Sequence, residues 1–161
     1  MDKKKRHSKR LHSLFTIIII FLLVYSAAFI TGLFRADAWY KNLRKPAFIP
    51  SDVVFLVGWN ILYMLIAVVI ILLWKEQSER HHITVIFSTN LVLNLLWSVF
   101  FFGLHKPDFA FFDLLLLVAS IIGAIVYAYN RRRAAAYLLI PYLLWILFVA
   151  YLNYQIAFFF N

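Results

Sequence analysis

The sequence predicts an all-α membrane protein, folded as a bundle of five transmembrane helices. Hydrophobic residues make up 65% of the 161 residues and charged residues only 14%, whereas soluble domains are about half apolar and about a quarter charged. Five apolar runs are each long enough for the roughly 20 residues that a helix needs to cross a bilayer. The runs lack the alternating polarity of barrel strands, and backbone in lipid must satisfy its own hydrogen bonds, so helices are expected.

The expected spans occupy residues 14–33, 53–74, 83–103, 109–129 and 134–160, so a single transmembrane domain covers residues 14–161. Residues 1–13 form a basic tail ahead of the first span. This tail resembles the start of a secretory signal peptide, but the apolar run behind it is too long for one and lacks a good cleavage site. We therefore expect it to remain as a span.

The Lys and Arg residues are divided unevenly between the two sides of the bundle. Eleven lie in the tail, the 75–82 connection and the 131–133 run, and five lie in the other two connections. This bias predicts a cytoplasmic N-terminus and an outside C-terminus, and we expect a multi-pass protein of a bacterial plasma membrane. The net charge of +9 then reflects anchoring at anionic headgroups rather than binding of nucleic acid.

Residues 34–52 form the one long connection, on the predicted outer side. Long ordered loops in compact domains are often lids or binding loops. This loop carries four of the five basic residues of its side, namely Arg35, Lys41, Arg44 and Lys45. We expect it to cover the mouth of any binding site.

Two of the five tryptophans lie too deep for the aromatic belt at the membrane surface. Trp74 ends its span and fits the belt, and Trp39 also lies near an interface. Trp59 lies about 10 Å inside its span, and Trp145 stands near the middle of the last one. Their indole N–H groups should point into the bundle and find partners there. A role in lining a cavity and a role in simple helix packing explain the depth of these two tryptophans about equally well.

Polar residues lie at a similar depth. Asn90, Asn94 and Trp97 recur along one face of the third span, and Tyr63 lies one turn below Trp59. An intramembrane Asn serves as often to join helices as to contact a ligand. Because Asn94, Trp59 and Trp145 coincide in depth, we favour an inward-facing site.

Other chemistry finds little support in the sequence. There is no Cys, all five His lie in tails or connections, and no catalytic triad, carboxylate pair or phosphate loop is present, so we expect no metal site and assign no catalytic residue. Asp113, near the outer end of its span, is expected to snorkel or to pair with Lys106. Pro141 predicts a kink one turn before Trp145.

Several motifs in order resemble one known family. Residues 39–50 read W-Y-x-x-L-x-K-P-x-x-x-P, followed by Phe55, Trp59 and Leu62-Tyr63; an L-N-x-x-W-S segment begins at Leu93 and a P-Y-x-x-W segment at Pro141. The chain is similar over residues 35–160 to the translocator protein / tryptophan-rich sensory protein (TspO) family. Several motifs in the same order are far more specific than any one alone.

The resemblance implies a five-helix bundle, often dimeric, with a cavity capped by the first loop and with porphyrins such as protoporphyrin IX as ligands. It also implies a receptor, transport or stress-sensing role, with no cofactor required. Light-dependent porphyrin degradation, reported for some bacterial relatives, would make Trp59 and Trp145 the candidates for photochemistry. The expected ligand-binding residues are Trp39, Tyr40, Pro46, Pro50, Trp59, Tyr63, Asn94, Trp97, Trp145 and Phe148, and Arg35, Lys41, Arg44 and Lys45 would attract ligand carboxylates.

Two departures from the family pattern bear on these expectations. Ser51 replaces a second loop proline, which affects the geometry of the lid, and the stretch after Tyr151 lacks the basic residue of the animal sterol motif. The alternative function is a structural or interaction protein whose aromatic residues only pack the bundle. An ion-coupled carrier ranks last, because the spans hold one acid and one clear proline kink.

Overall fold

The computed structural model describes the backbone of residues 2–33, 38–46, 48–74 and 77–159, and side chains from residue 14 onward except that of residue 77. Within these ranges the elements are all helical. They are α1 (Asp2–Leu33), α2 (Ala38–Asn42), α3 (Asp52–Leu73), the 3-10 turn η1 (Gln77–Glu79), α4 (Arg80–Ser98), the π-helical turn η2 (Val99–Gly103), α5 (Pro107–Arg131) and α6 (Arg133–Phe159).

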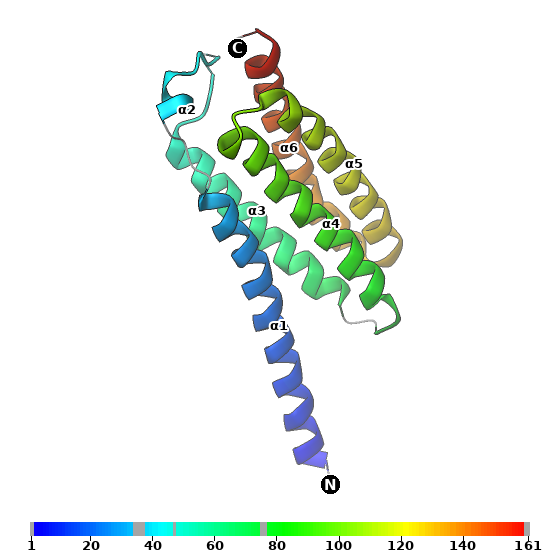
Figure 1. The fold of residues 1–161 in the computed structure, drawn as a ribbon. Helices are drawn as coiled ribbons and strands as arrows, with labels where there is room; N and C mark the ends of the chain where they lie inside the picture. The colour runs from blue at the N-terminus through cyan, green and yellow to red at the C-terminus, as the bar shows by residue number, and fades with distance from the viewer. Residues whose placement is uncertain (1, 34–37, 47, 75–76, 160–161) are drawn as a thin grey trace.

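The five predicted spans are confirmed. Five helices are long and apolar enough to cross a membrane: Leu14–Leu33, Asp52–Leu73, Arg80–Gly103, Pro107–Arg131 and Arg133–Phe159. The first of these is the apolar part of α1, which begins at Asp2, so the helix extends through the stretch that we assigned to the basic tail. The N-terminus and the C-terminus lie at opposite ends of the molecule (Figure 1), as five crossings require.

Local sequence signals set where the spans begin and end. The Ser51 hydroxyl accepts a hydrogen bond from the Val54 N–H at the start of α3, as an N-cap residue does. Pro107 occupies the first turn of α5, where its missing N–H costs nothing. Arg132 has an extended backbone that separates α5 from α6, so these two helices turn back on each other and form the most extensive helix pair in the bundle.

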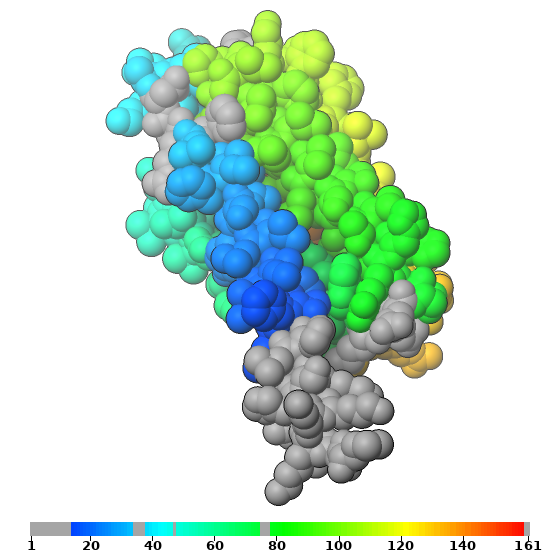
Figure 2. All heavy atoms as spheres, turned by 60° about the horizontal axis from the view of Figure 1, so that its bottom comes forward, coloured from blue at the N-terminus to red at the C-terminus, as the bar shows by residue number. Residues whose placement is uncertain are grey.

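Helix α1 packs against α3 and α4, and Figure 2 shows it between them on this face of the molecule. It contributes little to the core, where Ile20 and Val24 are its buried apolar residues among those described. Large apolar side chains on the outer faces of the other helices, such as Leu116 and Leu144, are exposed. Lipid must cover these faces, because exposed apolar area on this scale does not occur on a soluble monomer.

A buried polar stripe on α4 connects it to every other long helix. The Tyr142 hydroxyl of α6 donates to Asn90 Oδ1 (2.8 Å), and Asn90 Nδ2 donates to the Ser120 hydroxyl of α5 (2.8 Å). One turn further, the Tyr63 hydroxyl of α3 donates to Asn94 Oδ1 (2.6 Å). The Ser98 hydroxyl then donates to the Thr31 carbonyl of α1 (3.0 Å).

Three local details bear on the sequence-based expectations. The third span does not end as a regular α-helix, because Val99–Gly103 forms a π-helical turn. Helix α6 includes Pro141 within its length, and the kink expected there stays a prediction. Asp113 is buried, and among the described residues its Oδ2 has no hydrogen-bond partner and no ion pair joins it to Lys106, so the expected pairing is wrong.

We predict that Tyr142→Phe lowers the free energy of unfolding in detergent by about 0.6–1.7 kcal/mol, the range measured for interhelical hydrogen bonds in membranes. The substitution removes the donor to Asn90 Oδ1 and leaves a buried acceptor unsatisfied. Tyr137→Phe is the matched control, because Tyr137 lies on the same helix with its side chain exposed. Equal unfolding midpoints for the two variants in a denaturant titration would contradict the role of this bond.

Candidate functional site

A cavity of about 950 Å³ lies between α1, α3, α4 and α6, at the end of the bundle where α2 is found. Its walls are mostly apolar and aromatic, with contributions from Phe55, Trp59 and Tyr63 on α3 and from Trp97 and Phe101 on α4 and η2. Residues of the 34–52 loop, including Tyr40 and Pro50, line the end of the cavity nearest to α2. Its volume falls within the range of small-molecule sites, about 300–1,000 Å³.

The α3 wall follows from residue spacing, since Phe55, Trp59 and Tyr63 recur every four residues and therefore share one face of the helix. The Trp59 indole stacks on the Trp97 indole with ring centroids 5.7 Å apart and planes 24° apart. Trp97 in turn stacks on Phe101 at 5.9 Å. These rings form a continuous series of aromatic contacts that crosses from α3 to α4 and η2.

Polar groups are few in the cavity wall, and most are already paired. The Tyr63 hydroxyl lies 3.2 Å from the Thr31 hydroxyl and donates to Asn94 Oδ1. The Trp97 indole N–H donates to Asn153 Oδ1 (3.1 Å). Asn94 Nδ2 is the exception: it is buried and has no hydrogen-bond partner among the described residues. A buried amide donor without a partner is costly to the fold, so this group marks a place where a ligand acceptor would be favourable.

The mouth of the cavity carries both signs of charge. Lys41 and Asp52 line it, and the Lys45 ammonium lies 3.7 Å from the centroid of the Tyr40 ring. Burial, with a smaller contribution from the Asp52 carboxylate, raises the pKa of the Tyr40 hydroxyl, which therefore stays protonated at neutral pH. Arg44 is exposed and is not part of the described lining, and Arg35 lies outside the described residues.

The loop is held at the far end of α4 by aromatic contacts. The Trp39 ring stacks on the His105 ring at 4.5 Å and meets the edge of Phe101 at 5.8 Å. His105 adopts a φ of 54°, a left-handed conformation that is uncommon outside glycine. Pro46 is buried in the loop and accepts a hydrogen bond from the Ile49 N–H through its carbonyl (3.2 Å). Trp39 and Pro46 therefore hold the lid and do not line the cavity.

Comparison with known proteins identifies the family. The model of the TspO/MBR family matches residues 17–159 of the chain. The chain belongs to the TspO/MBR family. A tryptophan-rich protein TspO from Archaeoglobus fulgidus is 35% identical, over 88% of this chain and 92% of that protein. The human translocator protein is 34% identical over 72% of this chain and 71% of its own length, and the tryptophan-rich protein TspO of Chlorobaculum tepidum is 33% identical over 75% and 78%.

The sequence-predicted site residues fall into two groups in this TspO/MBR family protein. Among the described residues, those on the cavity wall are Tyr40, Lys41, Pro50, Trp59, Tyr63, Asn94 and Trp97. Trp145 and Phe148 are not on it; their rings contact each other at 6.0 Å, and Trp145 meets Phe55 at 5.6 Å. The Trp145 Nε1 is buried without a hydrogen-bond partner among the described residues, so the expectation that it would find one is wrong.

The sequence reading missed Gly58 and Asn153. An added Cβ on Gly58 would lie 2.6 Å from Trp145 Cη2, so the glycine provides the space for the indole. Asn153 accepts from Trp97 and donates through Nδ2 to the Pro107 carbonyl (2.6 Å), joining α6 to the start of α5. A signal for Asn153 was available, because an amide near the end of an apolar span must find partners.

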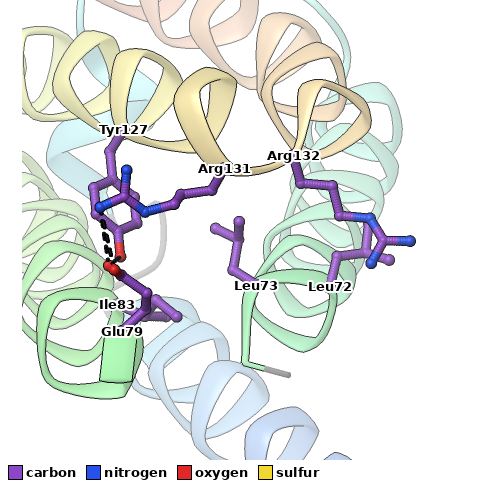
Figure 3. A pocket seen from close by; sticks show the side chains of 7 residues that line it. All are labelled: Leu72, Leu73, Glu79, Ile83, Tyr127, Arg131 and Arg132. Carbon is purple, nitrogen blue, oxygen red and sulfur yellow. Dashed lines mark hydrogen bonds and ion pairs between the residues drawn. The ribbon is translucent and has the colours of Figure 1, made fainter. Parts of the chain in front are cut away.

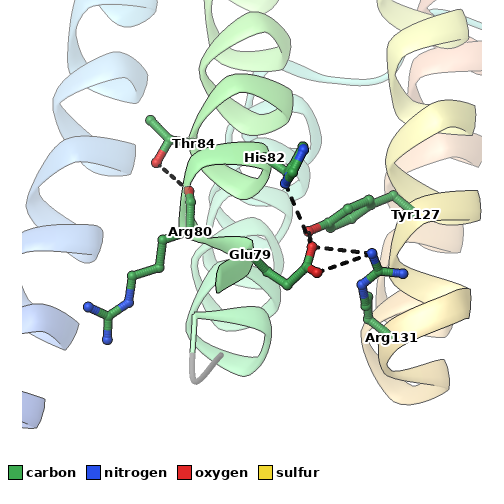
Figure 4. Close-up of polar contacts among 6 residues, drawn as sticks. All are labelled: Glu79, Arg80, His82, Thr84, Tyr127 and Arg131. Carbon is green, nitrogen blue, oxygen red and sulfur yellow. Dashed lines mark hydrogen bonds and ion pairs between the residues drawn. The ribbon is translucent and has the colours of Figure 1, made fainter. Parts of the chain in front are cut away.

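A second, smaller pocket of about 350 Å³ lies at the opposite end of the bundle. Glu79 forms its polar side: Oε2 accepts from the Tyr127 hydroxyl (2.6 Å), and the carboxylate forms an ion pair with Arg131 at 3.2 Å (Figure 4). His82 Nδ1 lies 3.8 Å from the same carboxylate. These contacts connect the start of α4 to the end of α5.

We predict that Gly58→Ala destabilises the protein by about 1–3 kcal/mol, the usual cost of overpacking, because the new methyl group collides with the Trp145 ring. Gly123→Ala is the matched control, since a Cβ there meets nothing within 4 Å, and it should be neutral or stabilising by up to about 1 kcal/mol. Thermal unfolding in detergent measures both. Equal losses in the two variants would show that the Gly58–Trp145 contact has no special role.

We predict a pH dependence that originates at Glu79. Hydrogen bonds from Tyr127 and then Arg131 lower the pKa of its carboxyl group, so the folded state binds its proton less readily than the unfolded state. The stabilisation is therefore fully present above the ordinary glutamate pKa of about 4.3 and is lost as the pH falls through the lowered value. The melting temperature of the native protein should exceed that of Glu79→Gln at pH 7 and converge with it at acidic pH. A constant difference across the range would rule out this origin.

Proposed function

We propose that this TspO/MBR family protein is a membrane receptor or transporter that binds a tetrapyrrole, such as protoporphyrin IX, in the cavity under the 34–52 loop. The observation that carries the proposal is the near-parallel pair Trp59 and Trp97. The pair lies in a cavity of about 950 Å³ whose lining includes Asn94, and Asn94 Nδ2 has no hydrogen-bond partner within the described part of the chain. Aromatic rings in continuous contact, together with one donor that has no partner among the described residues, support a planar apolar macrocycle with polar substituents as the ligand.

The physical fit has two parts. Porphyrin faces are large π surfaces, and offset stacking on indole and phenyl rings is favourable beyond the burial of area alone. The wall from Phe55 through Trp59 and Trp97 to Phe101 offers such surfaces in continuous contact. The apolar enclosure removes water from both partners, which supplies most of the binding free energy.

The carboxylates of the ligand would lie at the mouth. Lys41 is an exposed cation on the cavity lining, and a charge-assisted hydrogen bond to a propionate would orient the macrocycle with its polar edge outward. Asp52, on the same rim, disfavours a second carboxylate beside it. This asymmetry supports a single orientation of the ligand, with one propionate near Lys41.

The proposal is tested by titrating the purified protein with protoporphyrin IX and following the Soret absorbance, because removing a tryptophan changes the protein fluorescence itself. Trp59→Phe should weaken binding about threefold to tenfold, which corresponds to the loss of about 0.5–1.5 kcal/mol of stacking. Trp74→Phe is the matched control: Trp74 is on the same chain segment, at the opposite end of α3.

Two results would contradict the proposal. Equal affinities of Trp59→Phe and Trp74→Phe would place the ligand outside this cavity. If porphyrin also fails to raise the melting temperature of the native protein in detergent, the structural alternative is correct. Illuminating the same complexes tests the light-dependent degradation implied by the family, for which Trp59 and Trp145 are the proposed photochemical residues.

A further inference from the structure

The smaller pocket has walls of two kinds. Leu72 and Leu73 at the end of α3 and Ile83 on α4 form its apolar part. Glu79, Tyr127, Arg131 and Arg132 form its polar part. Figure 3 shows that the two arginines diverge: Arg131 extends toward Glu79, whereas Arg132 extends the other way, past the leucines to the side of Leu72.

The charges of the pocket do not balance. Glu79 is engaged by Arg131, with Nη2 lying 3.2 and 3.3 Å from the two carboxylate oxygens. The exposed Arg132 side chain makes no hydrogen bond, ion pair or ring contact with the described part of the chain. The lining therefore holds two arginines against one glutamate, and the uncompensated charge is that of Arg132.

The position of the pocket is that of a membrane interface. Helix α3 ends at Leu73, α5 ends at Arg131 and α6 begins at Arg133, so three spans terminate around it. Two further arginines at this end lie over aromatic rings, Arg80 over Trp74 at 5.6 Å and Arg133 over Tyr129 at 5.2 Å. Tryptophan, tyrosine and arginine gather at the headgroup level of a bilayer, which places the pocket beside phosphates.

We propose that this pocket binds the headgroup of an anionic phospholipid, with Arg132 contacting the phosphate and the half-buried Leu72, which lies beside the buried Leu73 and Ile83, contacting the glycerol and the first acyl carbons. A guanidinium that has no partner among the described residues is available for two parallel hydrogen bonds to phosphate oxygens. The apolar part of the pocket would contribute nothing to the binding of a free phosphate ion, but it suits a ligand that is apolar immediately beyond its charged group. Glu79 keeps Arg131 in place and, by its own charge, directs the anion to the Arg132 side.

The experiment uses the full chain in nanodiscs or detergent, with phosphatidylglycerol and phosphatidylcholine as the two lipids. Native mass spectrometry and melting temperature should both show a preference for phosphatidylglycerol. Arg132→Gln should reduce that preference about fivefold, the factor expected from removing one arginine at an anionic surface. Arg44→Gln is the control, because Arg44 is an exposed arginine in the loop at the opposite end of the bundle and loses the same charge.

A second variant tests the apolar part of the pocket separately from the charge of Arg132. Leu72→Trp fills the apolar part while keeping both arginines, and it should also weaken retention of phosphatidylglycerol while the protein stays folded, as judged by its helical circular dichroism. Equal effects of Arg132→Gln and Arg44→Gln would overturn the proposal in favour of general electrostatic attraction. Stabilisation by millimolar inorganic phosphate equal to that by phosphatidylglycerol would overturn it in favour of a free-anion site.

Discussion

The structure depends on the polar stripe of α4. In the hydrocarbon region no water is present to satisfy an amide or a hydroxyl, so a partner within the protein is strongly favoured, and on this face of α4 the partners lie on other helices. Asn90 joins α5 and α6, Asn94 joins α3, and Ser98 joins the end of α1. Hydrophobic packing alone cannot set the rotation of one apolar helix against another in lipid, because lipid tails are as apolar as leucine. The directional hydrogen bonds of Asn90, Asn94 and Ser98 can set this rotation.

The polar stripe of α4 also determines where the cavity lies. Around Asn90, whose side chain bonds to both α5 and α6, the polar groups of α4 are paired, and α4 packs against α5. Nearer the loop, Asn94 retains an unpaired donor and Trp97 directs its indole N–H to Asn153, so its ring is left to face α3. The cavity is thus the part of the bundle in which the polar groups of α4 are only partly satisfied by the protein itself.

The sequence predicted the five spans and much of the cavity wall, and the reasons are physical. Apolar length decides a span, and the spacing of Asn90, Asn94 and Trp97 by four and then three residues placed them correctly on one buried face. The position of Trp145 was not predictable in this way, because its depth indicates burial but not whether a neighbouring glycine, here Gly58, opens a slot that draws the ring away from the cavity. Asp113 was misjudged for a related reason, since snorkelling depends on the direction of the side chain around the helix. The π-helical turn at Val99–Gly103 had no local signal, because the run VFFFG contains neither proline nor a polar interruption.

The stack of Trp39 on His105 has a consequence for how the cavity can change shape. His105 lies two residues after the π-helical turn that extends α4, so the lid contacts the end of the same stretch of chain that supplies Asn94 and Trp97 to the cavity wall. The height of the cavity, from Asn94 to the loop that covers its mouth, is therefore spanned by one continuous stretch of chain, residues 94–105. Its width is set differently, by α1 and α3, which meet α4 across separate contacts. The two dimensions of the cavity therefore depend on different interactions: its height on one continuous stretch of backbone, and its breadth on the packing of side chains between separate helices.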